Sequence, residues 1–170
     1  MDALAFCNVG GKDCDMEYLV FAQEKHARVP LATLLSNARS YFGWSVTVLD
    51  EQGVPEDGSP APSSRVLLEL ENSQRGGAAR FEVAARHVSP ADQLAAREAE
   101  ARSQAAGMAN LAERCPTVWE LTPAPPGPQA ATYEMCAILA SAALGPVMPR
   151  DGSSLFGVRG ALERARRAAG

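Results

Sequence analysis

Apolar residues recur at the helical period in the segment from residue 30 to residue 42. They fall at i, i+3, i+4, i+7 and i+11, and they are Leu31, Leu34, Leu35, Ala38 and Phe42. Such a stripe is typical of a helix with one face toward a core. Pro30 suits the first helical position, and Gly43 suits the residue just past the end. We therefore predict a helix over residues 30–42.

Two other patterns indicate strands. In residues 44–48, 66–71 and 80–86, apolar and polar side chains alternate with period two, which is typical of a sheet with one packed face and one wet face. Residues 18–22 are apolar without interruption, which favours a strand that is covered on both faces. Residues 117–121, around Trp119, read as a last short strand.

Three further helices are expected. Ser89 precedes Pro90 and has Asp92 three residues later, so it marks a well-specified helix start. A helix from there to Arg114 would be about as long as the whole domain, and Gly107 is the place where it would bend or split. Residues 130–144 form an almost entirely apolar, hence buried, helix, and residues 159–169 form an arginine-rich one.

The resulting order is β-α-β-β-β-α-β-α-α. Adjacent alternating strands followed by helices predict an α+β fold, with a mainly antiparallel sheet of about five strands and helices packed mostly on one face. The length of 170 residues fits one domain over 1–170. We expect a loose arm at 1–15 and loops within the domain at 51–64 and 123–128.

Charge narrows the class of partner. The net charge is −4 and the sequence pI is about 5.2, which argues against a nucleic-acid partner because such proteins usually carry a basic patch. The charge is uneven, since residues 1–72 hold 11 acidic and 5 basic side chains, a net of −6. This half of the chain suits a basic partner.

The four cysteines do not form a recognisable metal motif. Cys7, Cys14, Cys115 and Cys136 lack the spacing of a zinc site, so we expect no metal and no cofactor. The first residues have neither the basic segment nor the apolar run of a secretory signal, which predicts a cytoplasmic protein. The longest apolar stretch, residues 135–144, is too short to span a membrane.

Candidate catalytic residues are few. Gly10-Gly11-Lys12 is followed by Asp13, where a phosphate-binding loop needs Ser or Thr. The two histidines of the chain, His26 and His87, are the groups best suited to acid–base chemistry. Asp13, Asp15 and Glu17 are the carboxylates that would assist either histidine. A small enzyme or ligand-binding protein built on these residues is one hypothesis.

The preferred hypothesis is a non-enzymatic protein-binding module, such as an adaptor, an inhibitor or an immunity-type protein. It would present an acidic surface to a protein partner through Glu51, Glu56, Asp57, Glu69 and Glu71. Trp44 and Trp119 are core or core-edge residues, and whichever is exposed is the best interface anchor. A third hypothesis is a subunit of a homo-oligomer, because alanine dominates the stripe of residues 89–114 and would permit close helix packing.

Overall fold

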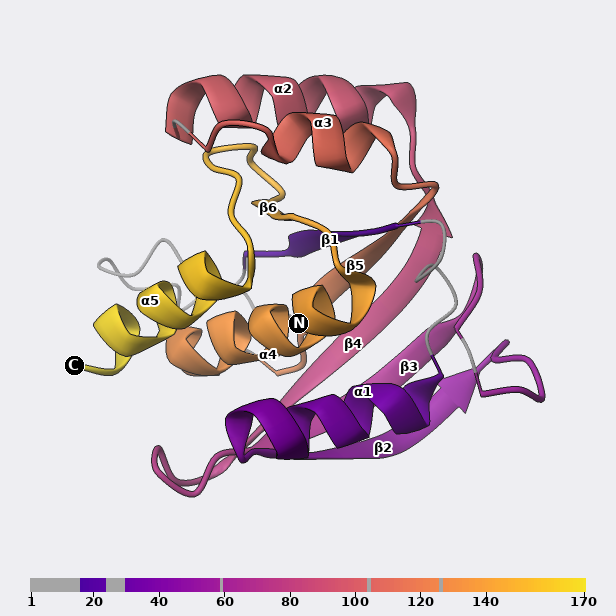
Figure 1. Cartoon of the computed structure of the whole chain (residues 1–170). Coiled ribbons are helices and arrows are strands. Elements are labelled where there is room, and N and C mark those ends of the chain that lie inside the picture. Colours follow the sequence, from indigo (N-terminus) through magenta and orange to yellow (C-terminus); the bar gives the residue numbers. More distant parts are fainter. Residues whose placement is uncertain (1–15, 24–29, 59, 104, 126) are drawn as a thin grey trace, which may run out of the picture.

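The computed structural model of the chain describes residues 16–23, 30–58, 60–103, 105–125 and 127–170. Within these ranges six strands form one antiparallel sheet in the order β2-β3-β4-β5-β1-β6 (Figure 1). The strands are β1 (Tyr18–Ala22), β2 (Ser45–Gln52), β3 (Arg65–Glu71), β4 (Ala78–His87), β5 (Thr117–Pro123) and β6 (Val147–Pro149). The predicted α+β fold is confirmed. The predicted arm at 1–15 lies outside the described residues.

The sheet has one strand more than we expected. Val147, Met148 and Pro149 form β6, which pairs with β1 at the edge of the sheet. Three residues are too few to show a period-two pattern, and Pro149 weakens any strand signal. The sequence pattern therefore did not reveal this strand.

The helices lie on both faces of the sheet. Those in the described ranges are α1 (Leu31–Asn37), the π-helical segment η2 (Ala38–Phe42), α2 (Pro90–Ser103), α3 (Met108–Glu113), α4 (Gln129–Ala143) and α5 (Val158–Ala169). The sheet separates α1, α4 and α5 from α2 and α3 (Figure 1). None of these helices is both long enough and apolar enough to cross a membrane.

The ends and the break of the predicted helices follow from local chemistry. Gly43 ends η2 with a φ of 71°, a left-handed conformation that favours glycine. Ser89 Oγ accepts a hydrogen bond from the backbone N–H of Asp92, and Asp92 Oδ2 accepts one from the backbone N–H of Ser89. This reciprocal cap starts α2 as predicted. The chain then leaves the helical path, and Gly107, with a φ of 89°, precedes α3.

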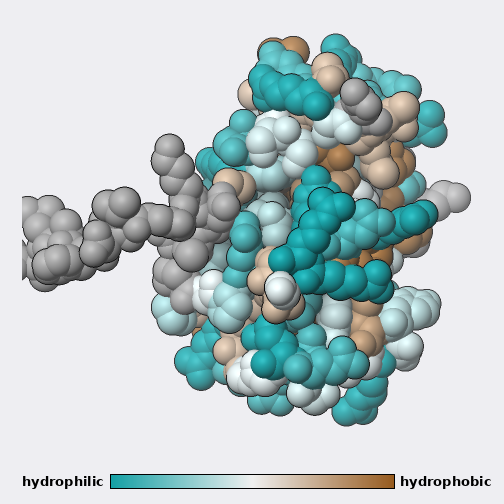
Figure 2. All heavy atoms as spheres, turned by 90° about the vertical axis from the view of Figure 1, so that its left-hand side faces the viewer, coloured by the Kyte–Doolittle hydropathy of each residue, from teal (hydrophilic) through white to brown (hydrophobic). Residues whose placement is uncertain are grey.

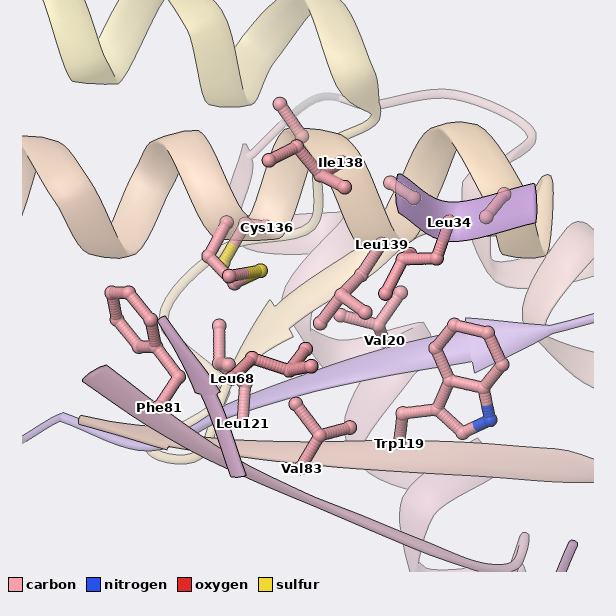
Figure 3. Close-up of a cluster of buried hydrophobic side chains, with 14 of the residues drawn as sticks. Val20, Leu34, Leu68, Phe81, Val83, Trp119, Leu121, Cys136, Ile138 and Leu139 are labelled. Atoms are coloured by element: carbon pink, nitrogen blue, oxygen red, sulfur yellow. The ribbon is translucent and has the colours of Figure 1, made fainter. Parts of the chain in front are cut away.

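The larger core lies between the sheet and the helices α1 and α4, and α5 packs on α4. Val20, Leu68, Phe81 and Leu121 project from four strands toward the helices (Figure 3). The helix α4 is buried nearly all round, as its composition predicted. This core runs under all the strands from β2 to β1.

A smaller core lies on the opposite face and covers only part of the sheet. It contains Leu19 and Phe21 of β1, Val118 of β5 and Met148 of β6, packed against alanines of α2 and α3. No residue of β2, β3 or β4 belongs to it among the described residues. The β1–β5–β6 half of the sheet is therefore covered on both faces, and the β2–β3–β4 half on one.

Two predicted loops begin later than expected. Strand β2 continues to Gln52, with a bulge between Val48 and Asp50, so the loop predicted over 51–64 starts after Gln52. Strand β5 continues to Pro123 in pairing with Phe81 of β4. Glu51 therefore belongs to a strand and not to the loop.

Candidate functional site

The bare face of β2, β3 and β4 carries opposite charges in pairs. Arg80 Nε lies 2.7 Å from Glu69 Oε2, and Arg65 Nη1 lies 3.3 Å from Glu82 Oε1. These are neighbours on adjacent strands, where opposite charges stabilise a sheet modestly. Glu69, one of the predicted partner-binding residues, is thus already paired. The face is a mixed charge ladder and not a uniformly acidic surface.

The predicted acidic residues form two groups rather than one. Glu71 is exposed and pairs with Ser45 at the first end of β2. Glu51 lies at the other end of β2, opposite Val66 of β3, and Glu56 and Asp57 are exposed in the turn that follows. The two ends lie five residue steps apart along β3, from Val66 to Glu71, which is about 17 Å at the rise of a strand. Glu51, Glu56 and Glu71 have no ion pair within the described ranges.

The two tryptophans have different surroundings. Trp119 is 3% exposed and packs in the larger core. It therefore cannot contact a protein partner and is not an interface anchor. Trp44 is half-buried and stacks on Phe42, with ring centroids 4.9 Å apart and an interplanar angle of 13°. Tyr41 is 71% exposed and lies edge-on to Phe42. An aromatic cluster therefore stands at the start of β2.

A groove of about 600 Å³ opens beside this cluster. It lies between η2, the β3–β4 turn, the start of α4 and the end of α5, the end of the molecule that Figure 2 faces. That surface is mostly hydrophilic, with hydrophobic side chains showing between the polar ones (Figure 2). Its lining includes Phe42, Trp44, Arg75, Glu134, Leu162 and Arg166.

Buried charges line part of the groove. The side chain of Glu134 is 7% exposed, and Glu134 Oε2 lies 3.3 Å from Arg75 Nε. Asn72 Nδ2 donates to Glu134 Oε1 at 2.8 Å, so both carboxylate oxygens are occupied. Arg75 Nη1 donates to the carbonyl of Gly76, whereas Arg75 Nη2 is buried with no hydrogen-bond partner among the described atoms. The donor left without a partner here is therefore a buried guanidinium nitrogen.

The second hypothesis placed histidines beside carboxylates. His26, Asp13 and Asp15 lie outside the described residues. His87 is exposed at the end of β4, opposite Thr117, whereas Glu17 directly precedes Tyr18, which pairs with Leu121. In this register Glu17 lies level with Thr122, so the two side chains are separated by about five residues along β5, roughly 17 Å at the rise of a strand. His87 and Glu17 are therefore not brought together.

Glu17 instead belongs to a chain of ion pairs along one face of the sheet. Arg150 Nη1 lies 3.0 Å from Glu17 Oε2 and 3.3 Å from Glu120 Oε1, and Glu120 also accepts from Arg86. Arg86 binds Asp92 with both terminal nitrogens, at 2.7 and 3.0 Å. This chain joins β4, β5 and the residues that flank β1 and β6 to the start of α2.

Asp92 is the most strongly perturbed carboxylate of that chain. Burial would raise its pKa, but hydrogen bonds from Arg86 and from Ser89 outweigh burial and lower the pKa to about 2. Arg86 in turn has a raised pKa, because hydrogen bonds from its guanidinium to Asp92 and Glu120 favour the charged form. Asp92 stays ionised at neutral pH and serves as a structural cap.

The described cysteines are not suited to nucleophilic chemistry. Burial raises the pKa of Cys115 to about 11 and also raises the pKa of the fully buried Cys136. Thiolates are the reactive form, so both thiols are inert at neutral pH. No cluster of three or more His, Cys, Asp or Glu side chains occurs in the part of the chain that the structure describes. Cys7 and Cys14 lie outside it.

The sequence reasoning did not single out most of the groove residues. The sequence pattern places Phe42 only in a helical stripe and Arg166 only in an arginine-rich helix, and it indicates no role for Arg75. Glu134 does stand out in the sequence, because it is the only charged residue in α4, a helix that is mostly apolar. A buried carboxylate requires a partner, so its presence there indicates a charged neighbour from another element.

Comparison of the chain with protein-family models, with curated proteins and with solved structures gives no significant match.

Proposed function

We propose that this protein is a non-enzymatic binding module that engages a protein partner along the margin of the sheet formed by β2. The observation that carries the proposal is the combination of exposed apolar and acidic side chains there. Tyr41 is 71% exposed and Leu49 is 41% exposed, the latter at the β2 bulge. Asp50 and Glu51 follow directly and are exposed. We call these four residues the β2 margin.

The β2 margin has the residue composition of a small protein–protein interface. Interfaces combine apolar or aromatic anchors with a polar rim, and Tyr is enriched among the residues that dominate binding energy. Glu71 at one end and Glu56 at the other extend the acidic rim. Acidic residues around such an anchor would raise the association rate of a basic partner.

The same features disfavour a homo-oligomer formed by edge-to-edge pairing. A bulge interrupts β2 at Leu49, and Asp50 and Glu51 add like charges along the strand. Bulges and charges are the devices that prevent an edge strand from pairing with another copy. A partner that contacts side chains fits this margin better than one that adds a strand.

The test begins with the tagged protein as bait in an extract of its source cells at moderate salt, with partners identified by mass spectrometry. The purified partner is then titrated with wild type, with Tyr41→Ala and with Glu51→Lys/Glu71→Lys. We expect each variant to weaken binding by about tenfold or more. The charge reversal should act through a slower association rate and should reduce the dependence of the affinity on salt.

The matched control is Glu98→Lys/Glu163→Lys. These glutamates lie on α2 and α5, and each makes one i,i+4 ion pair worth only a few tenths of a kcal/mol. The control has the same change in net charge but leaves the margin intact. If it weakens binding as much as Glu51→Lys/Glu71→Lys, the margin is not the binding surface. A single monomeric species with no stoichiometric partner would contradict the proposed function itself.

A further inference from the structure

The groove described above has the size and the two-sided character of a small-ligand site. Its volume of about 600 Å³ lies within the usual range for ligand pockets, roughly 300–1,000 Å³. One wall is apolar and includes the stacked rings of Phe42 and Trp44 together with Leu162. The remainder is polar and includes Arg75, Glu134 and Arg166. A ligand with one apolar part and one charged part would match both the apolar wall and the polar remainder of the groove.

The charges determine which ligand fits. Glu134 is neutralised by Arg75, and its two oxygens already accept hydrogen bonds from Asn72 and Arg75. Arg166 is exposed and makes no ion pair within the described ranges, whereas Arg75 Nη2 is itself buried. A groove with two arginines and one satisfied carboxylate has a surplus of positive charge, and this surplus favours an anion.

The aromatic wall specifies the other part of the ligand. Planar rings pack favourably against indole and phenyl rings, in stacked or edge-on arrangements. Phe42 and Trp44 hold each other in a stack, so the wall is formed before a ligand arrives and loses little side-chain freedom on binding.

We propose that this groove binds a small aromatic anion, a planar ring that carries a carboxylate or sulfonate group. The ring lies against the wall of Phe42 and Trp44, and the anionic group faces Arg166, with Arg75 adding to the positive charge of the groove. This site is separate from the proposed protein-binding margin, and the two share no residue.

The first experiment uses two fluorescent probes with the same ring system. Anilinonaphthalene sulfonate carries the anionic group, and phenylnaphthylamine lacks it. We expect the sulfonate to bind with one-to-one stoichiometry and at least about tenfold more tightly than the neutral probe, the gain typical of one charge-assisted hydrogen bond. Equal affinity for the two probes, or no saturable binding of the sulfonate, would overturn the proposal.

The second experiment locates the site with neighbouring arginines on α5. Arg166→Gln removes a lining cation, and Arg167→Gln removes an exposed cation that does not line the groove. We expect Arg166→Gln to raise the Kd of the sulfonate about tenfold and to leave the neutral probe unchanged. Arg167→Gln should leave both within twofold. Equal losses in the two variants would mean that the probe senses only the net charge of the helix, and would overturn the site.

The third experiment tests the ligand class by competition. Benzoate should displace the bound sulfonate probe, whereas acetate, which lacks the ring, and benzyl alcohol, which lacks the charge, should not. Trp44→Leu should weaken both the probe and benzoate, and its thermal unfolding shows whether the variant is folded. Displacement by acetate as effective as by benzoate would contradict an aromatic site, and Arg166→Gln keeps the anion requirement testable even if Trp44→Leu does not fold.

Discussion

Strand β1 has all five of its side chains buried, whereas β3 alternates between buried side chains and more exposed ones. The difference arises because α2 and α3 cover the second face of the β1–β5–β6 half and leave the β2–β3–β4 half open. The covered half is held by apolar packing on two sides. The open half is held by packing on one side and by cross-strand ion pairs on the other.

The two halves of the sheet are therefore expected to differ in their contributions to stability and to binding. Buried apolar surface supplies most folding free energy, so the covered half should dominate the stability of the domain. Exposed pairs of charges contribute roughly 0–1 kcal/mol each, so the open face can change its side chains at little cost to folding. The features that we propose for recognition, the β2 margin and the groove, both adjoin the open half.

The largest expected effect is at Gly145, just after α4 in the covered half. A Cβ at this position would overlap the backbone carbonyl of Phe21 in β1, which cannot rotate away. We expect Gly145→Ala to lower the free energy of unfolding by more than about 3 kcal/mol, measured by urea denaturation.

The matched glycine is Gly43, just before β2 in the open half. Its φ is 71°, and no atom lies within 4 Å of a Cβ built there. Gly43→Ala should therefore cost only about 1–2 kcal/mol, from the left-handed backbone alone. Equal costs at the two glycines would contradict the tighter packing of the covered half.

A series of Leu→Ala variants compares the two halves directly. Leu19 of β1 is 4% exposed in the smaller core, and Leu68 of β3 is 1% exposed in the larger core. Each should lose about 2–5 kcal/mol of unfolding free energy in the same urea measurement. Leu67 is the neighbour of Leu68 on the open face, and Leu67→Ala should lose less than about 1 kcal/mol. A loss at Leu67 comparable to that at Leu19 would mean that the open face is covered.

A pH-dependent effect concerns the ion pair at the boundary of the two halves. Because the pKa of Asp92 is lowered from 3.8 to about 2 in the folded protein, its ionised form contributes stability above about pH 4. That contribution is lost as the pH falls toward 2. The difference in unfolding free energy between wild type and Asp92→Asn should therefore shrink over this range.

The control for that measurement is Glu98→Gln, which removes an exposed carboxylate of the same helix. Its difference from wild type should stay small and nearly constant over the same range of pH. A difference for Asp92→Asn that does not change between pH 4 and pH 2 would show that the ion pair with Arg86 adds nothing to stability.

Much of the fold could be predicted from local patterns. The uninterrupted apolar run of 18–22 indicated a strand covered on both faces, and the alternation around Leu68 indicated one covered on a single face. Both predictions are confirmed, because side-chain period directly reflects which faces are buried. The start of α2 at Pro90 and the break at Gly107 followed from the conformational preferences of single residues.

Other features depend on contacts between distant segments and left no local pattern. The insertion of β1 between β5 and β6 is set by pairing, which alternation does not specify. The groove combines Phe42, Arg75, Glu134 and Arg166, which come from four different elements. The one local signal was the isolated charge of Glu134 within a mostly apolar helix, from which a distant partner could have been predicted.

The place of β1 in the sheet has a consequence for how the chain assembles. Strands β2, β3 and β4 form a meander of sequence neighbours, so their pairing requires only short loops to close. Tyr18 of β1 pairs with Leu121 and Pro149, which are far along the chain. As a ribosome releases the chain from its first residue onward, β1 leaves early but has no partner until β5 and then β6 emerge. Strand β1, whose five side chains are all buried in the folded protein, therefore remains unpaired until late in synthesis, and a chaperone would have most to protect during that interval.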